Sequence, residues 1–244
     1  MANWSDPQST ATPHSVPTSA GRTDVDAGLR SHMLSVYNYM ACGVLLTGIV
    51  AYVAGMLGIP QALFTGGNIL GYVVIFAPLI MVFFLMARVG KMSVGGMQAF
   101  FWSFAAVMGL SMSMIPLIYS GSSIATAFVG ASAAFVSLSL WGYTTKKDLS
   151  GFGTFLIMGV VGLIVASIAN IFMRSDAMSM AISAIGVLLF AGLTAYDTQK
   201  IKSIYFQVQG SDMLGKAAIM GALTLYLDFI NMFQFLLSLI GNRD

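Results

Sequence analysis

Residues 31–87 read SHMLSVYNYMACGVLLTGIVAYVAGMLGIPQALFTGGNILGYVVIFAPLIMVFFLMA, and none of them is Asp, Glu, Lys or Arg. A helix needs about 20 apolar residues to cross the hydrocarbon core of a bilayer. This run is therefore long enough for two spans. The turn-forming residues of GIPQALFTGGN interrupt it near its middle. We expect two membrane helices here, joined by an uncharged hairpin.

The rest of the chain repeats this organisation. Residues 92–145 form a second charge-free run, broken at IPLIYSGSS. Three single apolar segments follow, at about 151–173, 177–198 and 214–240. Hydrophobic residues make up 57% of the sequence and charged ones 8%, whereas a soluble domain carries about 25% charged residues. The sequence predicts an all-α membrane protein, a bundle of seven transmembrane helices.

The positions of Lys and Arg predict the orientation of this bundle. If the N-terminus is cytoplasmic, nine basic residues fall on the inner side, namely Arg22, Arg30, Arg88, Lys91, Lys146, Lys147, Lys200, Lys202 and Lys216. Only Arg174 and Arg243 fall outside. The positive-inside rule strongly favours this arrangement, which places the C-terminus outside. A span miscounted by one would abolish the segregation, so it also supports the number seven.

The N-terminal residues differ from the remainder. Residues 1–28 are rich in Pro, Ser, Thr and Asp, which predicts a disordered cytoplasmic tail. The seven-helix transmembrane domain is expected to occupy residues 29–244. No apolar run precedes Met33, so no cleaved signal peptide is expected.

Composition disfavours several other functions. The net charge of +2 is too small to indicate nucleic-acid binding. Cys42 is the only cysteine, and the two histidines, His14 and His32, lie near the N-terminus, so neither a disulfide framework nor a His/Cys metal site is expected. No cofactor is predicted.

Two aspartates carry the strongest functional signal. Asp228 lies within KAAIMGALTLYLDFINMFQFLLSLIG, and Asp197 ends the preceding apolar segment in FAGLTAYDTQK. Ionising a carboxylate in hydrocarbon costs at least ~2.5 kcal/mol, so such a residue is expected to face a partner or a water-filled cavity. On the last helix, Thr224 and Asn231 share the face of Asp228, which makes them candidates for lining a pathway.

Structural roles compete with this interpretation. Asp197 could be a helix-end charge paired with Lys200 or Arg88, and Asp228 could be buried for packing alone. Their depths also disagree. Asp228 lies 12 residues, roughly 18 Å of helix, from Lys216, whereas Asp197 lies only roughly 4.5 Å from Lys200. The aspartates can meet only if the last helix begins below the membrane or tilts, or if Lys200 lies deeper than expected.

Five segments resemble the Bax inhibitor-1 family, also called the lifeguard or transmembrane Bax inhibitor motif family, in its bacterial form. They are VYNYMACGVLLTG, ARVGKMSVGGMQAFFW, LSLWGYTTKKDLSGFGTFLIMGVVGLIVASIANIF, FAGLTAYDTQKIK and LTLYLDFINMFQFLLSLIG. The resemblance covers about residues 30–242, and its last two motifs are highly specific. It implies a seven-helix bundle with the last helix near the centre, in the bacterial inner membrane.

The resemblance also implies a function. Family members behave as pH-sensitive calcium leak channels whose paired aspartates match Asp197 and Asp228. An arginine matching Arg88 latches their closed state. Calcium prefers six to eight oxygen ligands, so the two aspartates would provide only a weak, transient site. Some bacterial relatives are instead partners of a membrane protease, which leaves a non-conducting regulator of a protease or quality-control complex as the alternative.

An enzyme is disfavoured. Intramembrane aspartyl proteases also carry a Tyr-Asp on a sixth helix, which Tyr196 and Asp197 match. Their second motif is Gly-x-Gly-Asp, whereas Leu225, Tyr226 and Leu227 precede Asp228 here. Without those glycines the backbone has no evident way to admit a peptide strand.

Overall fold

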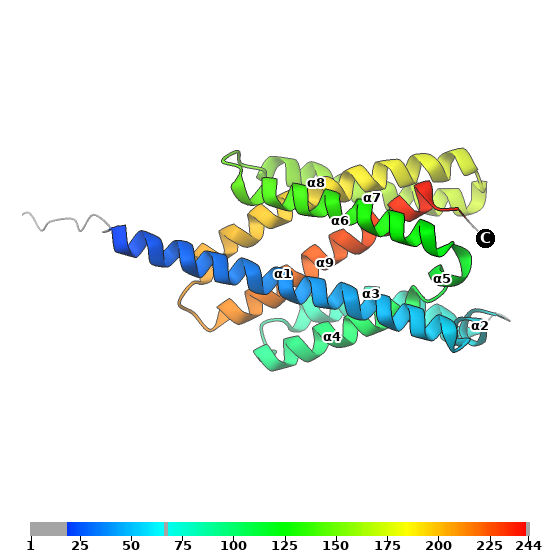
Figure 1. Cartoon of the computed structure of the whole chain (residues 1–244), viewed down its shortest axis with the longest axis horizontal. Helices are drawn as coiled ribbons and strands as arrows, with labels where there is room; N and C mark the ends of the chain where they lie inside the picture. The colour runs from blue at the N-terminus through cyan, green and yellow to red at the C-terminus, as the bar shows by residue number, and fades with distance from the viewer. Residues whose placement is uncertain (1–18, 66–67, 243–244) are drawn as a thin grey trace, which may run out of the picture.

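The computed structural model describes residues 19–65 and 68–242, with side chains placed from residue 27 onward (Figure 1). Within that part the chain forms α1 (Ser19–Met56), α2 (Ile59–Phe64), α3 (Ile69–Arg88), α4 (Val94–Ser111), α5 (Ile115–Ile118), α6 (Gly121–Thr144), α7 (Ser150–Met173), α8 (Asp176–Val208) and α9 (Met213–Ile240). Seven stretches are long and apolar enough to cross a membrane: α1, α3, α4 together with α5, α6, α7, α8 and α9. The predicted seven-helix membrane bundle is confirmed.

Serine side chains start three of the spans. The hydroxyl oxygens of Ser93, Ser120 and Ser175 accept hydrogen bonds from backbone N–H groups in the first turns of α4, α6 and α8. Such N-caps satisfy N–H groups that have no partner within the helix. The short helices α2 and α5 occupy the two hairpins where the sequence predicted interruptions in the charge-free runs.

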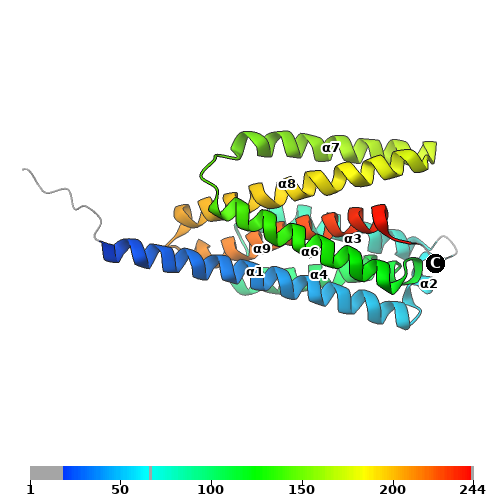
Figure 2. The same ribbon diagram turned by 45° about the horizontal axis from the view of Figure 1, so that its top comes forward.

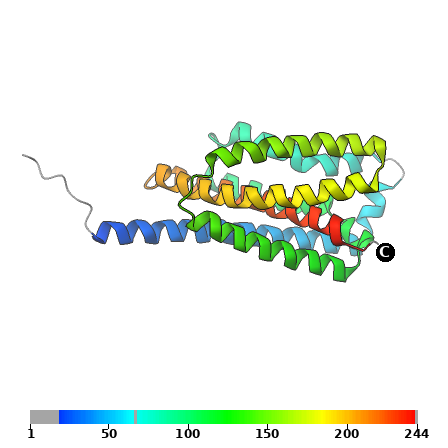
Figure 3. The ribbon, with the colours of Figure 1, turned by 90° about the horizontal axis from the view of Figure 1, so that it is seen from above.

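Helix α9 is the centre of the bundle. Half of the residues in its most apolar stretch are buried inside the bundle, whereas the corresponding share is 11% for α7 and 17% for α3. It packs on α8 above all, and also on α1, α6 and α4, as Figures 2 and 3 show. Helix α7 lies at the edge of the bundle against α8 (Figure 2). This confirms the predicted central position of the last helix, so side chains near the middle of α9 are shielded from lipid.

Two helix boundaries differ from the prediction. Helix α1 begins at Ser19 rather than at residue 29, after the last proline of the N-terminal segment, and residues 1–18 of the predicted tail lie outside the described residues. Helix α8 continues to Val208, ten residues past its predicted end. Ile201 and Tyr205, one turn apart, are both buried, so the extension has an apolar face that keeps it packed and helical.

The orientation can be tested with reporter fusions. A reporter placed after Thr65 or Ser120 is expected outside the cytoplasm, and one placed after Lys146 or Lys202 is expected inside, because the basic residues predict a cytoplasmic N-terminus. Alkaline phosphatase and green fluorescent protein activities distinguish the two sides. Finding the fusions after Ser120 and Lys146 on the same side would contradict the seven-span topology.

Candidate functional site

Helices α8 and α9 bring the two predicted aspartates together. Asp197 on α8 and Asp228 on α9 are 8% and 4% exposed. Their carboxyl groups lie within hydrogen-bonding reach of each other, an arrangement in which the carboxyl that carries a proton donates to the other. Two carboxylates this close cannot both ionise freely, so the pair titrates as a unit.

The two aspartates have different polar neighbours. Lys200, one turn from Asp197 on α8, is near enough to act on it electrostatically, although its ammonium group is not in direct contact with the carboxylate. Asp228 lies deeper, and among the described residues its buried Oδ2 atom has no hydrogen-bond partner. A buried polar atom left in this way is costly. Asp228 is therefore the more deeply buried of the two carboxyl groups and has fewer polar neighbours.

Asp197 opens onto a cavity of about 290 Å³ between α8 and α9. Lys200, Lys216 and Thr224 also line it, and Val89, directly after α3, closes one side. Asp228 lies behind Asp197 and does not line the cavity. The pair therefore separates a partly polar cavity, at the end of the bundle predicted to be cytoplasmic, from the packed centre of the bundle.

Of the two residues predicted to line a pathway, Thr224 lines the cavity and Asn231 does not. Thr224 lines the cavity, while its hydroxyl donates to the Met220 carbonyl oxygen. Asn231 is one turn beyond Asp228, away from the cavity, and its side-chain amide donates to the carbonyl oxygen of Leu227. The two candidates thus lie on opposite sides of the pair.

Arg88 is near the cavity but is not paired with Asp197. It is exposed at the end of α3, with its guanidinium 5.6 Å from the centre of the Phe84 ring. Within the described part of the chain no acidic group lies within ion-pair distance of it. The latch between Arg88 and Asp197 stays a prediction, for a different state of the protein.

The lengths of the helices explain how the aspartates meet. Asp197 lies eleven residues, about 16 Å, before the end of α8, and Asp228 lies fifteen residues, about 22 Å, after the start of α9. Both helices extend well past the pair towards their short connection, and the two distances differ by only four residues, about one turn. The expectation that Asp197 ends its helix was wrong, because α8 continues to Val208.

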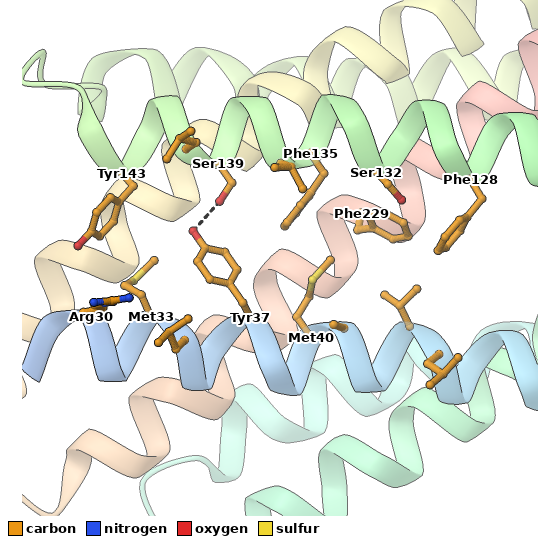
Figure 4. A pocket seen from close by; sticks show the side chains of 16 residues that line it. Arg30, Met33, Tyr37, Met40, Phe128, Ser132, Phe135, Ser139, Tyr143 and Phe229 are labelled. Carbon is orange, nitrogen blue, oxygen red and sulfur yellow. Dashed lines mark hydrogen bonds between the residues drawn. The ribbon is translucent and has the colours of Figure 1, made fainter. Parts of the chain in front are cut away.

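A chain of hydroxyl groups next to the pair was not predicted. The Tyr37 hydroxyl on α1 hydrogen-bonds to Ser139 on α6 at 2.7 Å (Figure 4). Ser139 also hydrogen-bonds to Thr198 on α8 at 2.9 Å. Thr198 in turn donates to the Thr194 carbonyl oxygen. Because Thr198 follows Asp197 directly, this chain ties the turn that carries Asp197 to α6 and α1. In the sequence, the hydroxyl residue Thr198 next to Asp197 in the motif YDTQK was the one feature that could have indicated this chain.

A second buried network holds the middle of α9. The Tyr226 hydroxyl lies 2.6 Å from the Thr47 hydroxyl on α1, which donates to the Ala105 carbonyl oxygen on α4. Tyr226 is fully buried between Phe101 and Phe104. Two residues before Asp228, it fixes α9 to α1 and α4 on a different face from the aspartate pair.

One further titratable side chain lies near this end of the bundle. His32 on α1 is buried against the Tyr205 ring, with 5.3 Å between the ring centres, and its Nε2 atom has no hydrogen-bond partner among the described residues. His32 therefore belongs to the packing between α1 and the extension of α8. Across residues 19–65 and 68–242, no group of three His, Cys, Asp or Glu side chains could hold a metal ion.

The chain is similar over most of its length to a family of membrane proteins and to several bacterial proteins. The family model described as "Inhibitor of apoptosis-promoting Bax1" matches residues 29–244. An uncharacterized protein of Rickettsia prowazekii is 45% identical over 93% of the chain and 95% of its own length. The inner membrane protein YbhL of Escherichia coli K12 is 45% identical over 89% of the chain and 94% of its own length. An uncharacterized membrane protein of Streptococcus pyogenes is 34% identical over 91% and 97% of the two chains.

Proposed function

Since the chain belongs to the Bax inhibitor family, we propose that it is a calcium leak pathway of the bacterial inner membrane whose opening depends on pH. The observation that carries the proposal is the buried pair of Asp197 and Asp228, whose carboxyl groups lie within hydrogen-bonding reach of each other, with Asp197 at the wall of a cavity. The location follows from its relative YbhL, which is an inner membrane protein. In this proposal the protein is not an enzyme, needs no cofactor, and has calcium as its cargo.

Protonation is the switch in this mechanism. With one proton on the pair, the protonated carboxyl group donates a hydrogen bond to the other, for which Asp197 and Asp228 lie close enough. At higher pH the pair loses that proton and carries two negative charges, and Arg88, beside the cavity-lining Val89, is then attracted to Asp197. An ion pair formed there would draw the end of α3 over the cavity. Closure is therefore expected as pH rises and opening as pH falls.

The packing of α3 supports such a movement. Helix α3 packs closely on α4 and α2 only, and it is among the least buried spans of the bundle. Its end can shift without breaking the contacts that hold α8 and α9 together. The moving part and the proton site would thus be on different helices.

Calcium would pass such a site without being stored in it. Calcium takes six to eight oxygen ligands, and the two carboxyl groups with the Thr224 hydroxyl supply fewer than that. Water molecules in a cavity of about 290 Å³ would complete the coordination. A partly dehydrated ion held in this way is bound weakly, which suits a leak rather than a store.

The test is calcium flux into vesicles that contain the purified protein and a trapped calcium indicator, measured from pH 6 to pH 8. Flux is expected to depend on the protein and to increase as pH falls. A folded, correctly inserted protein that carries no calcium at any pH would overturn the proposal. It would then favour the alternative, a non-conducting regulator of a membrane protease.

The latch makes a separate prediction. Arg88→Ala is expected to raise calcium flux at pH 8 and to weaken its dependence on pH, because no cation would remain on α3 to pair with ionised Asp197. Lys91→Ala is the matched control, since it removes a positive charge a few residues further along, on the same predicted side of the membrane. Equal flux in the Arg88→Ala and parent proteins at pH 8 would leave Arg88 as an ordinary positive-inside charge.

A further inference from the structure

A second and larger cavity lies between α1 and α6. Its volume is about 790 Å³, within the usual range for small-molecule sites, and Phe229 of α9 forms part of its floor. Figure 4 shows the two helices facing each other across it, connected by the Tyr37–Ser139 hydrogen bond. Helices α1 and α6 are not among the helix pairs that pack closely on each other. We refer to this cavity as the α1–α6 groove.

The groove opens sideways, towards lipid. Leu45 on α1 and Val136 and Leu140 on α6 line it and are 63%, 64% and 61% exposed. Apart from Arg30 and a few hydroxyl groups, its walls are aliphatic, aromatic and methionine side chains. In a bilayer such a surface is in contact with acyl chains rather than with water.

One end of the groove is polar and positively charged. Arg30 of α1 and Tyr143 of α6 face each other there, with the guanidinium and the hydroxyl on the same side of the groove (Figure 4). Lys202 of α8 is close behind Tyr143, since its ammonium group donates to the Tyr143 carbonyl oxygen. Within the described part of the chain no acidic group pairs with Arg30. An unpaired guanidinium beside a hydroxyl donor is suited to a phosphate group.

We propose that the α1–α6 groove binds one anionic phospholipid, with an acyl chain along its apolar walls and its phosphate on Arg30 and Tyr143. The charge selects the occupant. An uncharged apolar molecule would offer the Arg30 guanidinium no anionic partner, and a soluble anion would leave the apolar walls unused. The predicted topology places Arg30 at the inner leaflet, where a basic residue near the membrane surface attracts anionic lipid. This inference does not depend on whether the protein conducts calcium.

Native mass spectrometry of the full, delipidated chain in detergent tests the proposal. The probes are phosphatidylglycerol and phosphatidylcholine with identical acyl chains, titrated separately. One phosphatidylglycerol is expected to bind more tightly than all later ones and more tightly than phosphatidylcholine. Arg30→Gln is expected to weaken that first binding about fivefold, the effect of one cation on an anionic lipid near the surface. Lys91→Gln, which removes a charge on the same predicted side away from the groove, should leave it unchanged.

The apolar part of the site has its own matched pair of variants. Ser132 lines the groove, whereas Ser137 lies exposed on the same helix outside it. Ser132→Leu is expected to weaken the binding of the first lipid, and Ser137→Leu is not. Equal affinity for the two lipids, equal losses in Arg30→Gln and Lys91→Gln, or full binding by Ser132→Leu would each overturn the proposal. If Ser132→Leu does not fold, the comparison of Arg30→Gln with Lys91→Gln still tests the proposal. Both residues are exposed, so neither substitution should prevent folding.

Discussion

Asp228→Asn is expected to abolish the pH dependence of calcium flux between pH 6 and pH 8 while leaving the bundle folded. The substitution keeps the shape of the side chain and its ability to hydrogen-bond to Asp197, but it removes the group that shares the proton. A neutral amide is also easier to bury than an ionised carboxylate, and Asp228 is only 4% exposed. Flux into vesicles and thermal unfolding in detergent measure the two parts of this prediction.

Asp197→Asn is expected to flatten the same pH response, and the double substitution should resemble either single one. Groups that act as a unit give effects that do not add, whereas distant and independent groups give effects that do. A proton shared between two carboxyl groups is lost when either group is replaced. The double variant therefore separates a pair from two independent sensors.

Asp148→Asn is the matched control for these variants. Asp148 is fully exposed between α6 and α7, outside the spans, and its carboxylate accepts a 2.9 Å hydrogen bond from the Ser150 backbone N–H. Hydrogen bonds from Ser150 lower the pKa of Asp148 below its ordinary value, so it is already ionised throughout pH 6 to 8 and gains or loses no proton there. Its replacement should leave the pH response intact. A double Asp197/Asp228 variant that still responds to pH would show that the sensor lies elsewhere, with His32 as the next candidate.

Hydrophobic patterning was sufficient to predict the spans and the central helix. A charge-free run such as residues 31–87 can adopt few structures other than membrane helices, because backbone polar groups in lipid must be hydrogen-bonded within the structure itself. The aspartates could be selected for a similar reason, since a carboxylate within an apolar segment needs a partner. What the sequence could not supply was the end of α8. Lys200 and Lys202 marked the membrane surface, yet burial of Ile201 and Tyr205 continues the helix to Val208.

Contacts between side chains of different helices could not be predicted from the sequence. Nothing in the spacing of Tyr37, Ser139 and Thr198 shows that three helices bring their hydroxyl groups together, since each residue is unremarkable within its own span. The α1–α6 groove is likewise defined by two helices that do not pack together, a property of the bundle rather than of either segment. The same holds for Arg88, whose motif position indicates a latch but whose side chain lies over Phe84 in this state.

One such contact sets the distance between α6 and α8 beside the aspartate pair. Gly142 of α6 lies against the backbone of Ala195, two residues before Asp197, and a Cβ atom added to it would meet the Ala195 carbonyl oxygen and come within 2.9 Å of its Cα. Backbone atoms in the middle of a helix cannot turn aside as a flexible side chain can. Small residues at such points allow membrane helices to approach closely.

Gly142→Ala is therefore expected to destabilise the protein by about 1–3 kcal/mol, the usual cost of overpacking a well-packed interior. Gly162→Ala is the matched control, because Gly162 of α7 has no atom within 4 Å of the added Cβ and should at most gain stability from the better helix former. Thermal unfolding in detergent compares the two. Since the Ser139–Thr198 hydrogen bond joins the same two helices next to Asp197, Gly142→Ala should also shift the pH at which flux changes, and Gly162→Ala should not. Equal stability of the two variants would mean that α6 and α8 are not held in contact at Gly142.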